Sequence, residues 1–119
     1  MGHLHRQNVA TAGEVRRFPH GHVEVVELGA VRVERGTFEP GWRWSYDNRP
    51  TAGTQLCMDQ HTAICLSGRM CVECDDGTET IIEVGDVVVI EPGHDAWTVG
   101  SQPCVLYDLA VGDHGGHLA

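Results

Sequence analysis

Between residues 62 and 93 the chain repeats one pattern, a short run rich in β-branched residues followed by a tight turn. Asp76-Gly77 is a strong hairpin signal, because glycine takes a positive φ without steric cost. Pro92-Gly93 suits a type II turn, in which proline fixes the first φ and glycine takes the second. Short runs between such turns predict antiparallel strands. The expected strands cover residues 61–66, 69–74, 78–84, 87–91 and 95–99.

The same kind of structure is expected on both sides of this region. Residues 22–28 and 31–35 alternate apolar with charged side chains around a Gly29-Ala30 turn, as half-buried strands do. Further strands are expected at 54–58 and 105–109. No stretch of ten residues combines a 3.6-residue apolar period with helix caps. The fold class is therefore predicted to be all-β.

The length of 119 residues is typical of one domain with its own core. We expect a barrel at 14–111, between a polar, flexible amino-terminal segment at 1–13 and a Gly-rich flexible tail at 112–119. The first residues lack the apolar core that a secretory signal needs, so a cytoplasmic location is expected.

The net charge of the chain limits the classes of partner that it is expected to bind. Eight Arg and Lys against 17 Asp and Glu give a net charge of −9, whereas nucleic acids and anionic membranes select basic patches. No run of apolar residues is long enough to span a membrane. The expected partner is a small organic ligand, and an anionic ligand held by local arginines is one alternative.

The order of motifs from Leu66-Ser67-Gly68 through Asp75-Asp76-Gly77-Thr78 to the stretch G-D-V-V-V-I-E-P-G-H-D-A-W at 85–97 resembles the core of a cupin. The resemblance covers about residues 36–110. It implies a small single-domain cupin, a double-stranded β-helix or jelly-roll barrel. It also implies a homodimer that covers an exposed strand edge, for which we expect residues 22–28.

Many cupins hold a metal ion with histidines from two motifs, and in this chain both motifs are degenerate. By the resemblance, His61 stands at the glutamate position of the first motif, and Cys57 and Gln55 stand at its two histidine positions. In the second motif the histidine position falls on Ala96 by strict counting, or on Asp95 if one residue is deleted in the turn, and His94 is immediately next to it. Positions 55, 57 and 61 differ by even numbers, so on one strand their side chains would share the interior face.

Two versions of the site follow from these residues. Cys57, His61 and one of His94 or Asp95 form a donor set suited to zinc, because thiolate and imidazole both bind that ion well. Nickel, manganese or iron are further alternatives. A metal-free site is equally compatible with the sequence, with His61 as catalytic general acid and base near neutral pH.

Residues 39–53 form the longest irregular stretch and contain Trp42, Arg43, Trp44 and Arg49. Such long loops in compact domains usually carry function. We expect a lid at the barrel mouth, with tryptophans that stack on a ligand and an arginine that pairs with its anionic group. In the alternative interpretation, the tryptophans pack a barrel end or a dimer interface.

The sequence thus predicts a small-molecule-binding cupin, with Gln55, Trp97 and Tyr107 completing the substrate-binding set. As an enzyme it would carry out metal-assisted or His61-mediated proton transfer, of the dehydration, isomerisation or cyclisation type. Oxygen activation fits less well, because iron oxygenases usually use two histidines and a carboxylate. The alternatives are a non-catalytic cupin that binds an effector or ligand, and a purely structural barrel.

Overall fold

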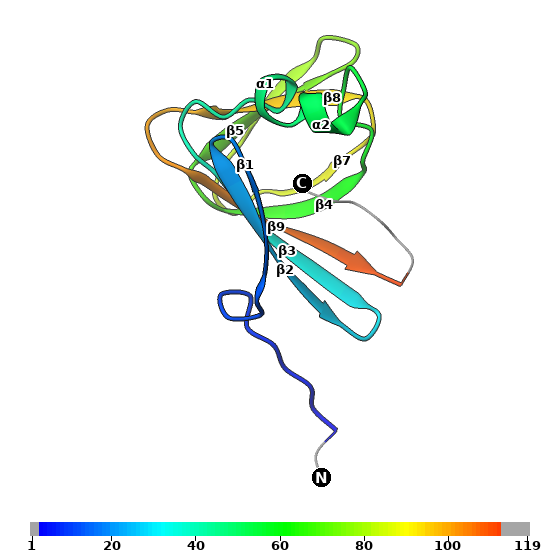
Figure 1. Ribbon diagram of the computed structural model, residues 1–119. Helices are drawn as coiled ribbons and strands as arrows, with labels where there is room; N and C mark the ends of the chain where they lie inside the picture. The colour runs from blue at the N-terminus through cyan, green and yellow to red at the C-terminus, as the bar shows by residue number, and fades with distance from the viewer. Residues whose placement is uncertain (1–2, 113–119) are drawn as a thin grey trace.

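The computed structural model describes residues 3–112 as a two-sheet barrel with two short helices at its mouth (Figure 1). The elements, in chain order, are β1 (Glu14–Phe18), β2 (Gly21–Leu28), β3 (Val31–Phe38), α1 (Trp44–Asp47), α2 (Arg49–Ala52), β4 (His61–Ser67), β5 (Arg69–Cys74), β6 (Glu79–Ile82), β7 (Val87–Ile90), β8 (His94–Val99) and β9 (Cys104–Val111).

All strand pairs are antiparallel. One sheet has the order β1-β2-β3-β9-β4-β7 and the other has the order β6-β5-β8. In the first sheet, β9 lies between β3 and β4. Of the strands from β4 to β8, β4 and β7 belong to the first sheet, and β5, β6 and β8 belong to the second. The predicted all-β, jelly-roll architecture is confirmed.

Strand alternation determines which side chains enter the barrel. On β4, His61, Ala63 and Cys65 are buried, whereas Thr62 is exposed. On β9, Leu106 and Asp108 are buried by the same alternation. The apolar core comprises Val23, Val25, Phe38, Trp42, Trp44, Cys57, Cys65, Met70, Val72, Ile82, Ala96, Cys104 and Leu106.

Three expectations about the elements are wrong. Residues 54–58 form no strand, and Cys57 alone pairs with His94 in an isolated bridge. The stretch 39–53 is not wholly irregular, since it contains α1 and α2; Pro50 stands in the first turn of α2, where its missing N–H costs nothing. Most of the expected edge at 22–28 is covered, because β1 pairs with β2 along Gly21 to Val25.

The predicted segments at the chain ends lie partly outside the described residues. Residues 3–13 form no strand, and the tail beyond residue 112 is not described. Neither helix in residues 3–112 is long and apolar enough to cross a membrane.

The turn between β4 and β5 depends on Gly68, whose φ is +68°. A Cβ at this position would lie 2.2 Å from the carbonyl oxygen of Pro103, which is backbone and cannot rotate away. We expect Gly68→Ala to lower the free energy of unfolding by at least about 2 kcal/mol, measured by denaturant unfolding. The matched control is Gly29→Ala, at a glycine with φ +61° where an added Cβ would meet no atom within 4 Å. An equal loss in both variants would contradict the role of this close approach.

Candidate metal centre

Three potential metal ligands converge inside the barrel: Cys57, His61 and His94. Their exposed fractions are 4%, 5% and 4%. The three donor atoms all lie within 4.8 Å of one another. His61 begins β4 and His94 begins β8, so the two sheets each contribute one histidine. Cys57 precedes β4 and is held by its bridge to His94, in which the Cys57 N–H donates to the His94 carbonyl at 2.8 Å.

Hydrogen bonds fix the orientation of both imidazole rings. His61 Nδ1 lies 2.8 Å from Asp108 Oδ2, and His94 Nδ1 lies 2.8 Å from the Glu91 carbonyl oxygen. Both oxygens accept, so each Nδ1 carries a proton and each Nε2 keeps its lone pair when the ring is neutral. Outer hydrogen bonds of this kind are typical of metal-ligating histidines.

The distance between the donor atoms of Cys57 and His61 fits a metal centre. Cys57 Sγ lies 3.6 Å from His61 Nε2. Tetrahedral zinc has Zn–S of about 2.3 Å and Zn–N of about 2.0–2.1 Å, which separates the sulfur and nitrogen ligands by about 3.6 Å. The same distance also suits a proton shared between thiol and imidazole. The donor set therefore fits either an ion or a proton between Cys57 and His61.

Without a metal ion, the thiol and the imidazole favour their charged forms. Burial opposes ionisation of Cys57, but hydrogen bonds from His61 and His94 outweigh it and lower its pKa to about 6. Burial also opposes the charge on His61, but hydrogen bonds to Asp108 and Cys57 raise its pKa to about 9. Between these values the metal-free pair is a thiolate beside an imidazolium.

The space beside the three side chains is small. The cavity has a volume of about 30 Å³, and Trp42, Trp44 and Ile90 are part of its lining. This is room for one or two water molecules, whereas pockets for organic ligands usually measure about 300–1,000 Å³. In this conformation the site is closed to organic molecules.

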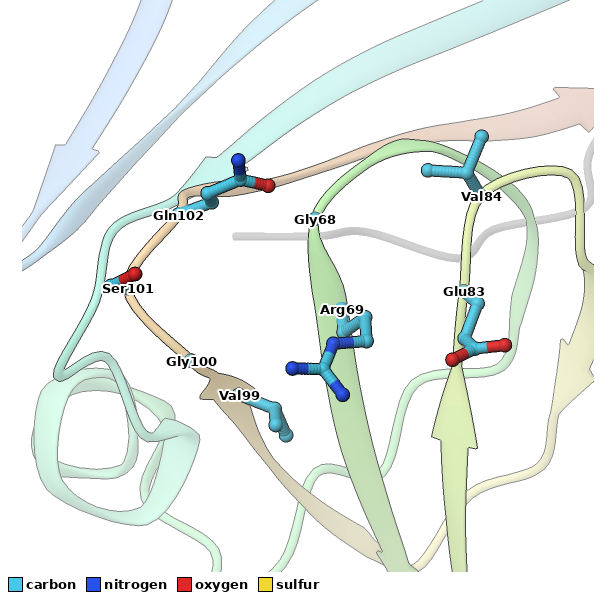
Figure 2. Close-up of a pocket in the computed structure, with 8 residues that line it drawn as sticks. All are labelled: Gly68, Arg69, Glu83, Val84, Val99, Gly100, Ser101 and Gln102. Carbon is cyan, nitrogen blue, oxygen red and sulfur yellow. The ribbon is translucent and has the colours of Figure 1, made fainter.

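A larger depression lies at the opposite end of the barrel, where β4, β6 and β8 end (Figure 2). Its volume is about 510 Å³, and Arg69 is the cation among its lining residues. In the view of Figure 2, the Arg69 guanidinium lies between the Val99–Gly100 backbone and Glu83. The depression is open to solvent and shares no residue with the cavity beside Cys57, His61 and His94.

Comparison of the sequence with protein-family models and with curated proteins found no match. Solved structures do match the fold. A cupin domain from Bordetella pertussis has a TM-score of 0.55 and 15% identity, over 81% of this chain and 97% of that one. A cupin-2 domain from Rhodospirillum rubrum has a TM-score of 0.59 and 13% identity, over 82% and 64% of the two chains. The protein has a cupin fold.

Two longer proteins match the cupin barrel over part of their length. AerE from Microcystis aeruginosa has a TM-score of 0.57 and 16% identity, and this chain spans only 42% of it. Oxalate decarboxylase from Bacillus subtilis, which has Mn(II) centres, has a TM-score of 0.52 and 21% identity over 82% of this chain and 27% of its own. At these identities the likeness concerns the fold alone.

Asp95 lies apart from the cupin cavity. Alternation along β8 points His94 and Asp95 to opposite faces, so Asp95 faces the outside of its sheet. There its carboxylate accepts hydrogen bonds from the Ser45 N–H at 3.0 Å and from Arg43 Nε at 3.1 Å. Asp95 therefore anchors α1, and of these two residues it is His94 that lies beside Cys57 and His61.

The structure divides the expected substrate-binding residues into two groups. Trp42 and Trp44 line the cavity. Arg43 instead lies outside the barrel, with its guanidinium carbon 4.5 Å from the centre of the Trp97 ring. That contact is a cation–π interaction, so Arg43 and Trp97 engage each other rather than the cavity.

Gln55, Arg49 and Tyr107 also lie outside the cavity lining. Gln55 is exposed and accepts a hydrogen bond from Arg49 at 3.3 Å. Tyr107 lies between the inward residues Leu106 and Asp108, so alternation turns it to the outer face of its sheet, opposite Arg35 on β3.

Asp108 is the residue of the site that the sequence analysis missed. It is 3% exposed, and its second oxygen accepts a hydrogen bond from the Thr62 N–H at 3.3 Å. The sequence does contain a sign of it. Asp108 follows Cys104 and Leu106 at intervals of two residues, so it shares the buried face of an otherwise apolar strand. A carboxylate at such a position needs a partner, because an unpaired buried charge is very costly.

The pKa of about 6 for Cys57 gives a direct test of the metal-free site. In chelator-treated protein, we expect the ultraviolet absorbance of thiolate to rise with a midpoint near pH 6 as pH increases, and this step to be missing in Cys57→Ser. The sign follows from the hydrogen bonds that favour the charged sulfur. A first thiolate step only above about pH 8, as for an ordinary thiol, would contradict the proposed pair.

Proposed function

We propose that this cupin binds one divalent metal ion through Cys57, His61 and His94 and uses it in small-molecule proton-transfer chemistry. The observation that carries the proposal is the convergence of three buried donor atoms within 4.8 Å, with both Nδ1 atoms already engaged elsewhere. With its Nδ1 held by Asp108, His61 turns its Nε2 toward Cys57 Sγ at 3.6 Å.

Zinc is the ion that suits this donor set best. One thiolate and two neutral imidazoles are common zinc ligands, and three protein ligands with an open fourth position are typical of catalytic zinc sites. Manganese prefers carboxylate and carbonyl oxygens, and no carboxylate belongs to the convergent donor set in residues 3–112. Nickel and iron are the alternatives that accept imidazole well.

The chain itself supplies ligands, orientation and exclusion of water. A bound divalent ion with an open position would polarise a carbonyl, hydroxyl or water oxygen. Asp108 holds the proton of His61 on Nδ1 and thereby keeps its Nε2 directed at Cys57. The cavity of about 30 Å³ accepts a ligand of a few atoms. A larger substrate requires displacement of Trp42 and Trp44.

The metal-free alternative rests on a different observation, the unbroken contact from Cys57 through His61 to Asp108. In that version the carboxylate orients His61, and His61 exchanges a proton with a ligand in the cavity as general acid and base. The same cavity would serve a non-catalytic cupin that only binds its ligand. Metal content separates the metal-dependent proposal from both alternatives.

The proposal is tested by metal analysis of the purified protein and by substitution with cobalt. We expect about one ion per chain and a thiolate-to-cobalt charge-transfer absorption in wild type. Cys57→Ser should abolish that absorption, because a hydroxyl is a poor ligand for such ions. His61→Ala and His94→Ala should lower metal content at least tenfold.

The matched control for the metal experiment is Cys74→Ser, because Cys74 is exposed and has no place in the cluster. Its metal content and cobalt spectrum should equal those of wild type. Metal-free wild-type protein that does not take up zinc or cobalt would overturn the metal-dependent proposal. The Cys57–His61–Asp108 alternative would then be tested by Cys57→Ser, which should retain most ligand binding if His61 is the active group.

Asp108→Asn should weaken metal binding by about 10- to 100-fold without removing a ligand, as loss of an outer-shell carboxylate commonly does. The measurement is competition with a chromophoric chelator, and circular dichroism verifies the fold. Asp75→Asn, an exposed change in the turn after β5, is the matched control. Unchanged affinity in Asp108→Asn would argue against the role of this carboxylate in orienting His61.

A further inference from the structure

The depression at the end of the barrel opposite the metal centre has the size of a site for a small organic molecule (Figure 2). Its volume of about 510 Å³ lies within the range of about 300–1,000 Å³ that is usual for such sites. Two of its lining residues are charged, Arg69 and Glu83, and Val84 and Val99 add apolar side chains. A ligand bound here would therefore meet one cation, one anion and an apolar surface.

The strand register places Arg69 opposite Glu83. The pairing of β5 with β6 ends at Met70 and Ile82, and Arg69 and Glu83 occupy the next position along the two chains. Opposite charges at facing positions of neighbouring strands commonly pair with each other. Here both side chains are exposed, and neither forms an ion pair or a hydrogen bond with another residue in the described range 3–112. Both charges are therefore available to a ligand.

Hydrogen-bond donors gather on the Arg69 side of the depression. A Cβ on Gly100 would lie 3.4 Å from Arg69 Nη2, so the guanidinium lies against the loop between β8 and β9. In the same loop, the backbone N–H groups of Ser101 and Gln102 have no acceptor among the described residues. Figure 2 shows this loop on one side of Arg69 and the Glu83 carboxylate on the other. The depression thus has a donor side and an acceptor side.

The backbone that carries these groups is held in place without a ligand. Arg69 pairs with Val99 in the register of β5 and β8. The preceding residue, Gly68, approaches Pro103 so closely that an added Cβ would lie 2.2 Å from the Pro103 carbonyl oxygen. These contacts fix the turn before β5 relative to the loop after β8. A site whose frame is formed before binding loses less entropy when a ligand arrives.

We propose that this depression binds a small zwitterion, a molecule with one carboxylate, one ammonium group and a short apolar body, such as an apolar α-amino acid. The Arg69 guanidinium presents paired N–H donors that match the two oxygens of a carboxylate. Glu83 accepts hydrogen bonds from the ammonium group. Val84, which is 64% exposed, covers the apolar body. The inference goes beyond the metal centre, with which the depression shares no lining residue.

The charges of the depression and of the whole chain favour a zwitterion over a singly charged ligand. An anion would meet Glu83 and the net charge of −9, and a cation would meet Arg69. Like charges brought together in this way select against the wrong ligand. A zwitterion carries no net charge, so the field of the acidic protein does not repel it. It also leaves neither Arg69 nor Glu83 without a partner.

The test compares three probes on the full chain by amide chemical shifts. L-Phenylalanine carries both charges, 3-phenylpropionate lacks the ammonium group, and 2-phenylethylamine lacks the carboxylate. We expect saturable binding of phenylalanine in the millimolar range, with shifts at Gly68, Gly100 and Ser101. Each singly charged probe should bind at least about tenfold more weakly, because it loses a hydrogen bond between charged groups.

Two variants assign the charges. Arg69→Gln and Glu83→Gln should each weaken phenylalanine binding at least about tenfold, and Glu83→Gln should also remove the preference for phenylalanine over 3-phenylpropionate. The matched control is Arg17→Gln, which should bind like wild type, because Arg17 is an exposed arginine of β1 outside the depression.

Circular dichroism and metal content should match wild type in all three variants, which separates this test from that of the metal centre. Three results would each overturn the proposal: no saturable binding of phenylalanine up to tens of millimolar, equal affinity for the three probes, or unchanged affinity in both Arg69→Gln and Glu83→Gln.

Discussion

The hydrogen bond between Asp108 and His61 has two effects inside the barrel. It gives a buried carboxylate a partner, and it orients an imidazole ring. Asp108 brings a carboxylate into a core of valine, leucine and cysteine, where an unpaired charge would be very costly. His61 and the backbone of Thr62 supply both of its partners from the adjacent strand β4. The same bond orients the imidazole toward Cys57. Stability at this position and chemistry at the neighbouring one therefore depend on one contact.

The turns and the strand periodicity made most of the fold predictable. Turn glycines and the alternation of side chains are local signals, and they placed His61 on the interior face of β4 correctly. The alternation rule cannot decide which of two neighbouring residues faces inward when the strand position is uncertain by one residue. Tyr107 and Asp108, or His94 and Asp95, exchange faces with a shift of one position. The structure puts Asp108 and His94 inside, and the sequence did not specify that phase.

The contacts outside the barrel could not have been predicted from local patterns. Arg43 and Asp95 are 52 residues apart in the chain and meet at 3.1 Å. That ion pair and the contact with Trp97 attach α1 to the outer side of β8. An arginine beside tryptophans in an irregular stretch is equally consistent with a ligand site and with such an anchor. Only the three-dimensional pairing decides between them.

The closed mouth of the barrel limits how fast an ion or ligand can enter or leave the site. Trp42 packs 4.4 Å from Phe38, measured between ring centres, and its indole N–H donates to Asn48 at 2.8 Å. Any ion or ligand that reaches Cys57 must wait for this segment to open. Exchange at the site cannot be faster than this opening, however strong the competitor in solution. A barrier of this kind slows exchange without changing the affinity, so occupancy reports binding once exchange is complete.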